Sequence, residues 1–154
     1  AEPVTMKEPV EVVEGVWATG PIPRETEFED TGGAFFKDAE CSEVDDLPDD
    51  QAVFADTAEG IVVALGCAHA GVINTLRYVN QLCPKRRIHA VIGGMHLVNA
   101  DAERMDRTVA ALRECDIQHL VPLHCTGFPA AARLWNEFPG CVSNGPVGTV
   151  LEFA

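Results

Sequence analysis

From Gln51 onward the chain alternates between strand-like and helix-like stretches, and this alternation limits the fold more than any other feature. Residues 51–66, QAVFADTAEGIVVALG, contain two apolar runs around a turn at 58–60, which predicts a hairpin. Short apolar runs follow at 88–94 and 119–123. Strands that alternate with helices favour an α/β layer structure with a largely parallel segment of sheet.

Three stretches after the hairpin have the apolar spacing of amphipathic helices. They cover residues 71–83, 100–115 and 129–138. Either Asn99 or Asp101 is placed to cap the second of these helices. We expect a further strand at 147–153 to close the pattern.

The first 50 residues have a different character. Residues 10–20 alternate enough to form a strand, whereas 42–50 read as an acidic loop. We therefore divide the chain into an N-terminal extended segment, 1–50, and an α/β part, 51–154.

Composition narrows the class of protein. A chain of 154 residues with 47% apolar residues can bury one ordinary core, so we expect a single compact unit. The net charge of -13 opposes binding to nucleic acids and to anionic membranes. The sequence has neither an apolar run long enough to span a bilayer nor a signal-peptide pattern, so a soluble, cytoplasmic protein is expected. The six cysteines are expected to be reduced thiols.

Three of the five histidines follow predicted strands. His69 lies three residues beyond the second hairpin strand, His96 follows the strand at 88–94, and His124 ends the strand at 119–123. The carboxyl ends of parallel strands share one edge of an open α/β sheet, where ligands bind. This placement predicts a site at that edge, with these histidines as candidate metal ligands.

The other two histidines, His89 and His119, lie at strand starts, so we interpret them as structural or solvent-exposed. Each candidate ligand also has an ordinary interpretation, because a histidine after a strand is more often a hydrogen-bonded loop residue.

Several other polar residues have two interpretations. Cys67 and Cys125 are more often small buried side chains than nucleophiles or ligands. Asp49 and Asp50 are weak site candidates because they directly precede the hairpin. Arg24 is either a surface charge or a clamp for an anionic group. Neither a Walker phosphate loop nor a GxSxG elbow occurs, so the sequence argues against a kinase-like protein and against a serine hydrolase.

Five motifs, in this order along the chain, resemble the C-terminal half of metallo-β-lactamase-fold metal hydrolases. They are TGPIPR (19–24), DDQAV (49–53), GCAHAGVINT (66–75), AVIGGMHL (90–97) and PLHCTGF (122–128). More narrowly, they resemble the subgroup around dihydropterin ribofuranosylaminobenzene phosphate synthase. The resemblance implies half of an αββα sandwich with one or two metal ions at one edge of its sheets.

The same resemblance suggests roles for individual residues. His124 matches the last histidine ligand of the fold, His69 matches a ligand on the preceding strand end, and His96 is the third choice. Zinc is the first choice of divalent metal, with manganese or iron as alternatives. Arg24 and Cys125–Thr126–Gly127 would face a phosphate-bearing or pterin-like small molecule. No residue is singled out as catalytic.

The chain departs from the family in one respect, because the HxHxDH signature of the first half is absent. A hydrolytic zinc usually has three protein ligands and an open position for water. We therefore expect a fragment, or one part of a split protein, that associates with a missing N-terminal half. The apolar sheet face left open would favour a homo-oligomer.

Two other classes of function remain open. One is a noncatalytic binding or scaffold domain with a degenerate metal site. The other is a thiol enzyme that uses Cys125 or Cys67 with a nearby histidine as its base.

Overall fold

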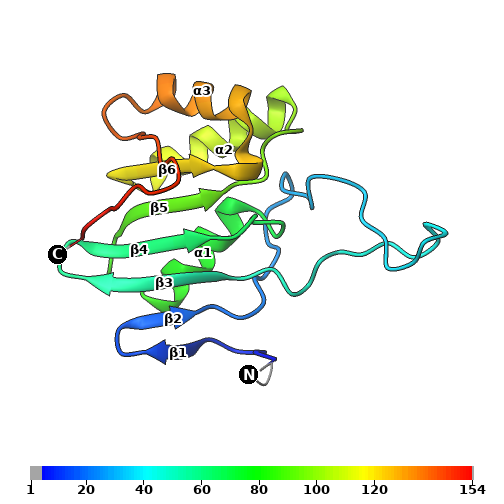
Figure 1. Cartoon of the computed structure of the whole chain (residues 1–154), viewed down its shortest axis with the longest axis horizontal. Coiled ribbons are helices and arrows are strands. Elements are labelled where there is room, and N and C mark those ends of the chain that lie inside the picture. The colour runs from blue at the N-terminus through cyan, green and yellow to red at the C-terminus, as the bar shows by residue number, and fades with distance from the viewer. Residues whose placement is uncertain (1–4, 154) are drawn as a thin grey trace.

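The computed structural model describes residues 5–153, which form one mixed six-stranded sheet with three helices (Figure 1). The strands follow chain order across the sheet, and the pairs from β1 to β4 are antiparallel, whereas β4, β5 and β6 are parallel. The predicted α/β class is confirmed. The elements are β1 (Val10–Val13), β2 (Val16–Ala18), β3 (Ala52–Thr57), β4 (Gly60–Leu65), α1 (Val72–Leu82), β5 (Ile88–Gly94), α2 (Ala102–Glu114), β6 (His119–Leu123), the short 3-10 turn η1 (His124–Thr126) and α3 (Phe128–Glu137).

The α/β part follows the apolar pattern closely. β3 and β4 form the predicted hairpin, paired from Ala52 and Leu65 to Thr57 and Gly60. The three predicted helices are present, each within two residues of the expected ends. Asp101 caps α2, since its carboxylate accepts a hydrogen bond from the N–H of Arg104 at 2.8 Å.

The prediction of a single strand at 10–20 was wrong. This stretch forms a hairpin of β1 and β2, which turns at Glu14 and Gly15. Gly15 has φ 77°, and its N–H donates to the Glu11 carboxylate at 2.9 Å. The alternation of apolar residues is the same in one strand or two, so only the glycine marked the turn. The division at residue 50 remains a prediction, and β2 pairs with β3 across it.

The prediction of a strand at 147–153 was also wrong. These residues, all of which the structure describes, form no strand. Val147 and Val150 are exposed. The place beside β6 is taken by Val142, which forms an isolated parallel bridge with Leu120. Valines at this spacing predict a strand only if a free strand edge lies within reach.

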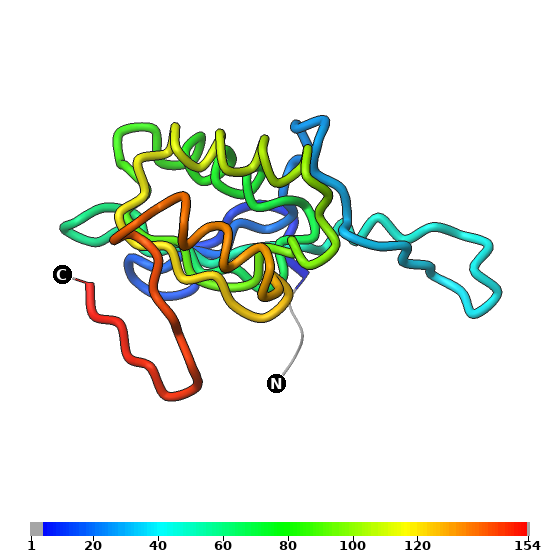
Figure 2. The backbone as a smooth tube through the Cα atoms, turned by 90° about the horizontal axis from the view of Figure 1, so that it is seen from above, coloured from blue at the N-terminus to red at the C-terminus, as the bar shows by residue number. Residues whose placement is uncertain are grey.

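One side of the sheet carries the core. Figure 2 shows α1 and α2 together on one side and the C-terminal segment on the other. Strand side chains pack against the two helices, and α3 joins through its buried Leu134. None of the helices in residues 5–153 has the length and hydropathy needed to cross a lipid bilayer. The largest buried side chains of this core include Ile61, Val63, Leu76, Val79, Leu112 and Leu120.

Two other segments lie near the carboxyl ends of β4, β5 and β6. Residues 35–46 form an arm that projects from the body of the protein (Figure 1) and is held by a bridge between Phe36 and Val44. Residues 25–33 cross the N-terminus of α1, where the buried Asn74 amide oxygen accepts from the N–H groups of Glu25 and Thr26, each at 2.9 Å. Both segments frame the edge where the histidines were expected.

Candidate metal centre

Cys67, His69 and His96 meet beyond the ends of β4 and β5. One ligand atom from each of these residues lies within 4.8 Å of the others, and the two imidazole rings are 4.1 Å apart. All three residues are partly buried. Thiolate and imidazole are among the donors that zinc binds in catalytic sites with three protein ligands.

The histidine nitrogens also suit a metal. His69 Nδ1 lies 3.0 Å from the Thr31 carbonyl oxygen, which can only accept, so Nδ1 carries the proton and Nε2 is left as a ligand. His96 Nδ1 is buried and has no hydrogen-bond partner among residues 5–153. A buried nitrogen without a partner is costly unless something binds it. The donor set therefore fits a divalent metal.

A second group shares Cys67 with the first. Cys67, His124 and Cys125 also place one ligand atom each within 4.8 Å of the others. The Cys125 thiol lies 3.5 Å from the Cys67 carbonyl oxygen, and His124 is exposed. The structure thus brings His69 and His96 together and places His124 in the neighbouring group.

Glycine lets the two cysteines meet, although they follow β4 and β6, which lie on either side of β5. A Cβ on Gly94, at the end of β5, would lie 2.5 Å from the Gly66 oxygen and 2.7 Å from Cys125 Sγ. Only glycine leaves room for this approach.

Three residues around the site have left-handed backbone. Ala68 has φ 54°, and His96 and His124 each have φ 46°. Such values are uncommon outside glycine and cluster at functional sites. The buried Thr126 helps to hold this backbone, because its Oγ1 accepts from the N–H of Met95 at 3.1 Å.

Gly94→Ala should destabilise the fold by about 1–3 kcal/mol, the usual cost of overpacking, and should weaken metal binding because Cys125 and the Gly66 carbonyl must move. Gly66→Ala is the matched control, because a Cβ there meets nothing within 4 Å. Denaturant unfolding and zinc titration of both variants make the comparison. Equal behaviour of the two variants would show that the close approach at Gly94 has no effect.

Burial lowers the pKa of His96 below its ordinary value of 6.5, and the neighbouring His69 and Arg104 act in the same direction. The unfolded chain then binds the proton more readily than the folded one. The contribution of His96 to the stability of the metal-free protein is thus present above pH 6.5 and is lost as pH falls through the lowered pKa. As pH is lowered from above 6.5 through the lowered pKa of His96, the free energy of unfolding should fall more for wild type than for His96→Asn. Parallel curves would contradict this assignment.

The residues expected to bind substrate have structural contacts of their own. The Arg24 guanidinium donates to the carbonyl oxygens of His69, at 3.0 Å, and Asp46, at 2.5 Å, and so connects the loop that carries His69 to the base of the arm.

Two cavities lie beside the candidate ligands. A cavity of about 390 Å³ is lined by His124, Thr126, Gly127 and Phe128, among others. A second, of about 340 Å³, is lined by Asp49, Asp50, Cys67 and His69, among others.

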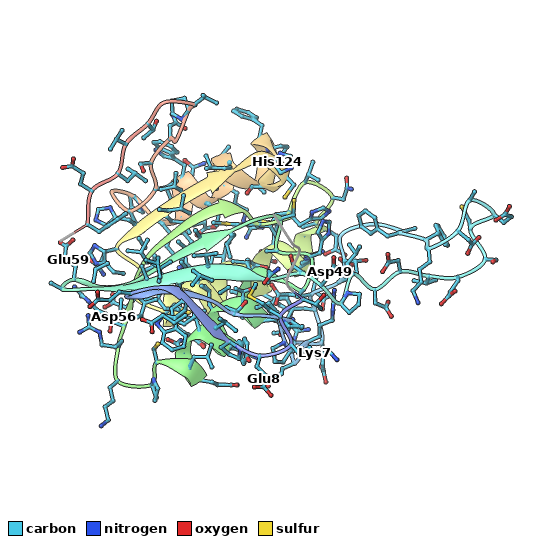
Figure 3. The ribbon with its side chains drawn as sticks, turned by 60° about the horizontal axis from the view of Figure 1, so that its bottom comes forward. Lys7, Glu8, Asp49, Asp56, Glu59 and His124 are labelled. Carbon is cyan, nitrogen blue, oxygen red and sulfur yellow. The ribbon has the colours of Figure 1, made fainter. Side chains whose placement is uncertain are left out.

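The histidines at strand starts lie away from the site. His89 is buried with its ring 4.9 Å from that of the exposed His119, and its Nε2 lies 3.8 Å from a carboxylate oxygen of Glu59. Figure 3 shows Glu59 and His124 toward opposite ends of the sheet.

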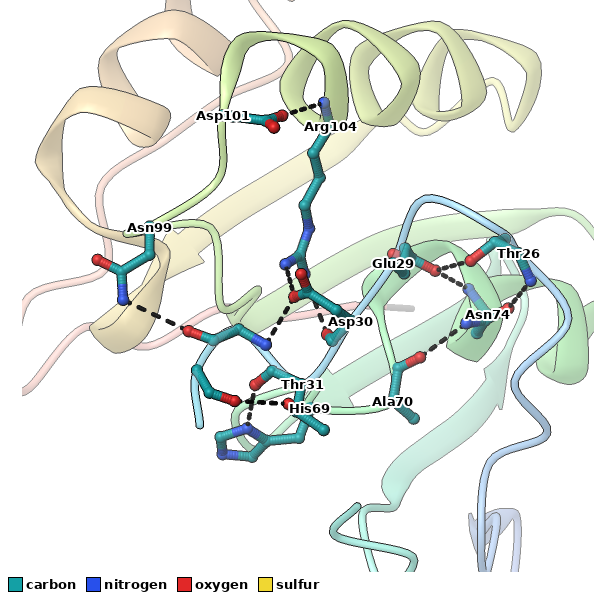
Figure 4. A network of polar contacts seen from close by, with 12 residues as sticks. Thr26, Glu29, Asp30, Thr31, His69, Ala70, Asn74, Asn99, Asp101 and Arg104 are labelled. Atoms are coloured by element: carbon teal, nitrogen blue, oxygen red, sulfur yellow. Dashed lines mark hydrogen bonds and ion pairs between the residues drawn. The ribbon is translucent and has the colours of Figure 1, made fainter. Parts of the chain in front are cut away.

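Sequence interpretation weighed Cys67 as a ligand but favoured a small buried side chain, and it did not single out residues 26–33. In Figure 4, Glu29 reaches the first turn of α1, where its carboxylate accepts from the N–H groups of Ile73 and Asn74, each at 2.8 Å. Next to it, Asp30 pairs with Arg104 of α2. The one available signal for Cys67 was its position directly after a strand and two residues before His69.

The surroundings of the Cys125 thiol do not activate it as a nucleophile. Burial raises the pKa of the Cys125 thiol above its ordinary value, which lowers the thiolate fraction at neutral pH. A metal ligand is therefore a better role for this cysteine than a nucleophile.

Two curated proteins are similar to the chain in sequence. No family model matches the chain. The chain is 27% identical, over 97% of its length, to 7,8-dihydropterin-6-methyl-4-(β-D-ribofuranosyl)-aminobenzene-5'-phosphate synthase of Methanocaldococcus jannaschii, of which it covers 52%. It is 33% identical, over 84% of its length, to an uncharacterized protein of the same organism, of which it covers 47%. It spans about half the length of these curated relatives.

A solved structure has a similar fold. The crystal structure of a metal-dependent hydrolase of the β-lactamase superfamily superposes with a TM-score of 0.86 and 29% identity, over 97% of this chain and 57% of that one. The predicted resemblance is thus confirmed by sequence and by fold. The six-stranded sheet and its three helices thus have the fold of part of a metal-dependent hydrolase of the β-lactamase superfamily, to which the chain is similar in sequence as well.

Proposed function

We propose that these residues contribute a metal centre to a metal-dependent hydrolase or transferase, with zinc held by Cys67, His69 and His96. The observation that carries the proposal is the meeting of a thiol and two imidazoles within 4.8 Å, with His69 Nδ1 already bonded to a carbonyl. Three protein ligands leave one tetrahedral position open, as catalytic zinc requires. The group around His124 and Cys125 offers room for a second ion.

The chain's own residues hold the ligands still. The Phe35 ring meets that of His69 edge-on at 5.1 Å, and Arg24 binds the His69 carbonyl oxygen. A bound zinc ion would supply Lewis acidity toward a substrate oxygen and would make a bound water more acidic. Fixed ligands reduce the reorganisation needed in the reaction.

The proposed substrate is a phosphate-bearing or pterin-like small molecule. One support is the name of the synthase to which the chain is similar. Another is the cavity beside His124, which is also lined by Gly127 and Phe128 at the start of α3. N–H groups in the first turn of a helix favour an anionic group.

The proposed partner is a second polypeptide surface, either the other half of the hydrolase fold or another copy of this chain. This proposal is supported by apolar surface of the sheet that residues 5–153 leave uncovered. Val53 is 40% exposed on β3, and its cross-strand partner Ala64 is also exposed. Residues that face each other across a pair of strands lie on one face of the sheet.

Metal retention tests the proposal. The metal-free protein is loaded with zinc or manganese, desalted and assayed by plasma mass spectrometry. We expect zinc to be retained at about one ion per chain or more, with retention lost in His69→Ala and kept in His89→Ala. His89→Ala is a demanding control because His89 is more deeply buried than His69. Equal losses in the two variants would overturn the proposal.

A further inference from the structure

We propose that Asp30 and Arg104 are positioning residues for the metal centre, because together they hold the turn at residues 30–32 against both His69 and His96. The inference rests on the proposed function and adds two residues that are not themselves ligands. Arg104 is 7% exposed, and its guanidinium pairs with the Asp30 carboxylate and lies 3.4 Å from the Asp30 carbonyl oxygen. The contact joins residues 74 positions apart in sequence.

Asp30 also positions His69, through the turn that its carboxylate closes. Its carboxylate also accepts from the N–H of Gly32 at 2.7 Å, which closes a tight turn around Thr31. The carbonyl oxygen of Thr31, inside that turn, accepts from His69 Nδ1 at 3.0 Å (Figure 4). This bond fixes the tautomer that leaves Nε2 as a ligand, and metal-binding histidines commonly have such an outer partner.

The same turn reaches His96. Gly32 has φ 77°, and a Cβ placed on it would lie 1.9 Å from His96 Cδ2, so the glycine backbone packs directly on that ring. Asn99 supports the turn from the other side, where its amide lies 3.4 Å from the Gly32 carbonyl oxygen. One turn of three residues therefore limits the movement of both imidazoles.

The burial of Arg104 indicates that this contact differs from an ordinary surface ion pair. Asp30 has a side chain that is 74% exposed, but Arg104 is buried, and its Nε has no hydrogen-bond partner among residues 5–153. Burying a guanidinium is costly, and an apolar side chain often stabilises such a position better. A role in fixing the turn accounts for a charge at this place.

The first test compares Asp30→Ala with Asp30→Asn. Zinc affinity should fall about 10–100-fold in Asp30→Ala, as is usual when an outer partner of a metal ligand is removed. Asp30→Asn should stay closer to wild type, because its amide oxygen can still accept from Gly32 and Arg104. The matched control is Asp106→Ala, another exposed aspartate paired with an arginine, which should bind zinc as wild type does.

Arg104→Met should weaken zinc binding to a similar extent, and the double variant with Asp30→Ala should bind no more weakly than either single variant. Additive losses would separate the two residues and contradict a shared role. Because the Asp30 side chain is largely exposed, Asp30→Ala should remain folded, which thermal unfolding checks.

A second readout needs no metal. Nitrogen NMR of the imidazoles in the metal-free protein should show His69 as the Nδ1–H tautomer in wild type and as a mixture of tautomers in Asp30→Ala. Unchanged tautomers together with unchanged zinc affinity in Asp30→Ala would overturn the inference. If wild type itself binds no zinc, the proposed function fails, while the tautomer comparison still decides whether the turn positions His69.

Discussion

Cys67→Ala is expected to abolish metal retention, with a loss of affinity greater than the roughly 100-fold seen when an outer partner of a ligand is removed. Cys67 is the only residue shared by the two groups of candidate ligands found in residues 5–153. Its loss leaves each group with two donors, fewer than a stable zinc site requires. Zinc competition with a chromophoric chelator measures the effect.

Two other cysteines make the comparison specific. Cys83→Ala is the matched control, because this partly buried thiol follows α1 and belongs to neither group. It should bind zinc as wild type does. Cys125→Ala should affect only the group that contains His124. If Cys67→Ala and Cys83→Ala retain equal zinc, Cys67 is not a ligand.

Glu29→Ala is expected to destabilise the protein by about 2–4 kcal/mol, the sum of a lost helix cap and two buried N–H groups left without partners. The capping residue of α1, Gly71, offers no side chain, and the Glu29 carboxylate takes that role from a distant segment. Gly71 permits the approach, since a Cβ there would lie 2.3 Å from the carboxylate. Denaturant unfolding at neutral pH measures the loss.

Glu27→Ala is the control for this second prediction, because Glu27 is an exposed glutamate in the same segment. It should change stability by less than about 0.5 kcal/mol. Burial raises the pKa of Glu29 despite these hydrogen bonds, so its desolvation opposes folding at neutral pH. A loss in Glu29→Ala as small as that in Glu27→Ala would mean that water replaces the carboxylate at the helix terminus.

The sequence predicted the α/β part because local patterns determine it. The strand at 88–94 has the predicted bounds, since its apolar residues are buried on both faces. The errors arose where local pattern has no tertiary support. Residues 147–153 have valines at strand spacing, but Val142 already bridges to β6. Alternation at 10–20 could not show that the chain reverses at Gly15.

The candidate site was predicted in outline for a similar reason. Parallel strands bring His69 and His96 to one edge, and this follows from topology alone. That Cys67 belongs to both groups depends on Gly94 and on left-handed backbone at Ala68, which no periodicity reveals. The contacts of Glu29 and Asp30 join positions more than 40 residues apart, so pattern analysis could not detect them.

X-ray absorption at the zinc edge of the zinc-loaded wild-type protein shows whether a cysteine binds the metal. A centre of Cys67, His69 and His96 predicts a sulfur ligand at about 2.3 Å together with imidazole nitrogens at about 2.0–2.1 Å. A zinc environment of nitrogen and oxygen alone in the wild-type protein would contradict it.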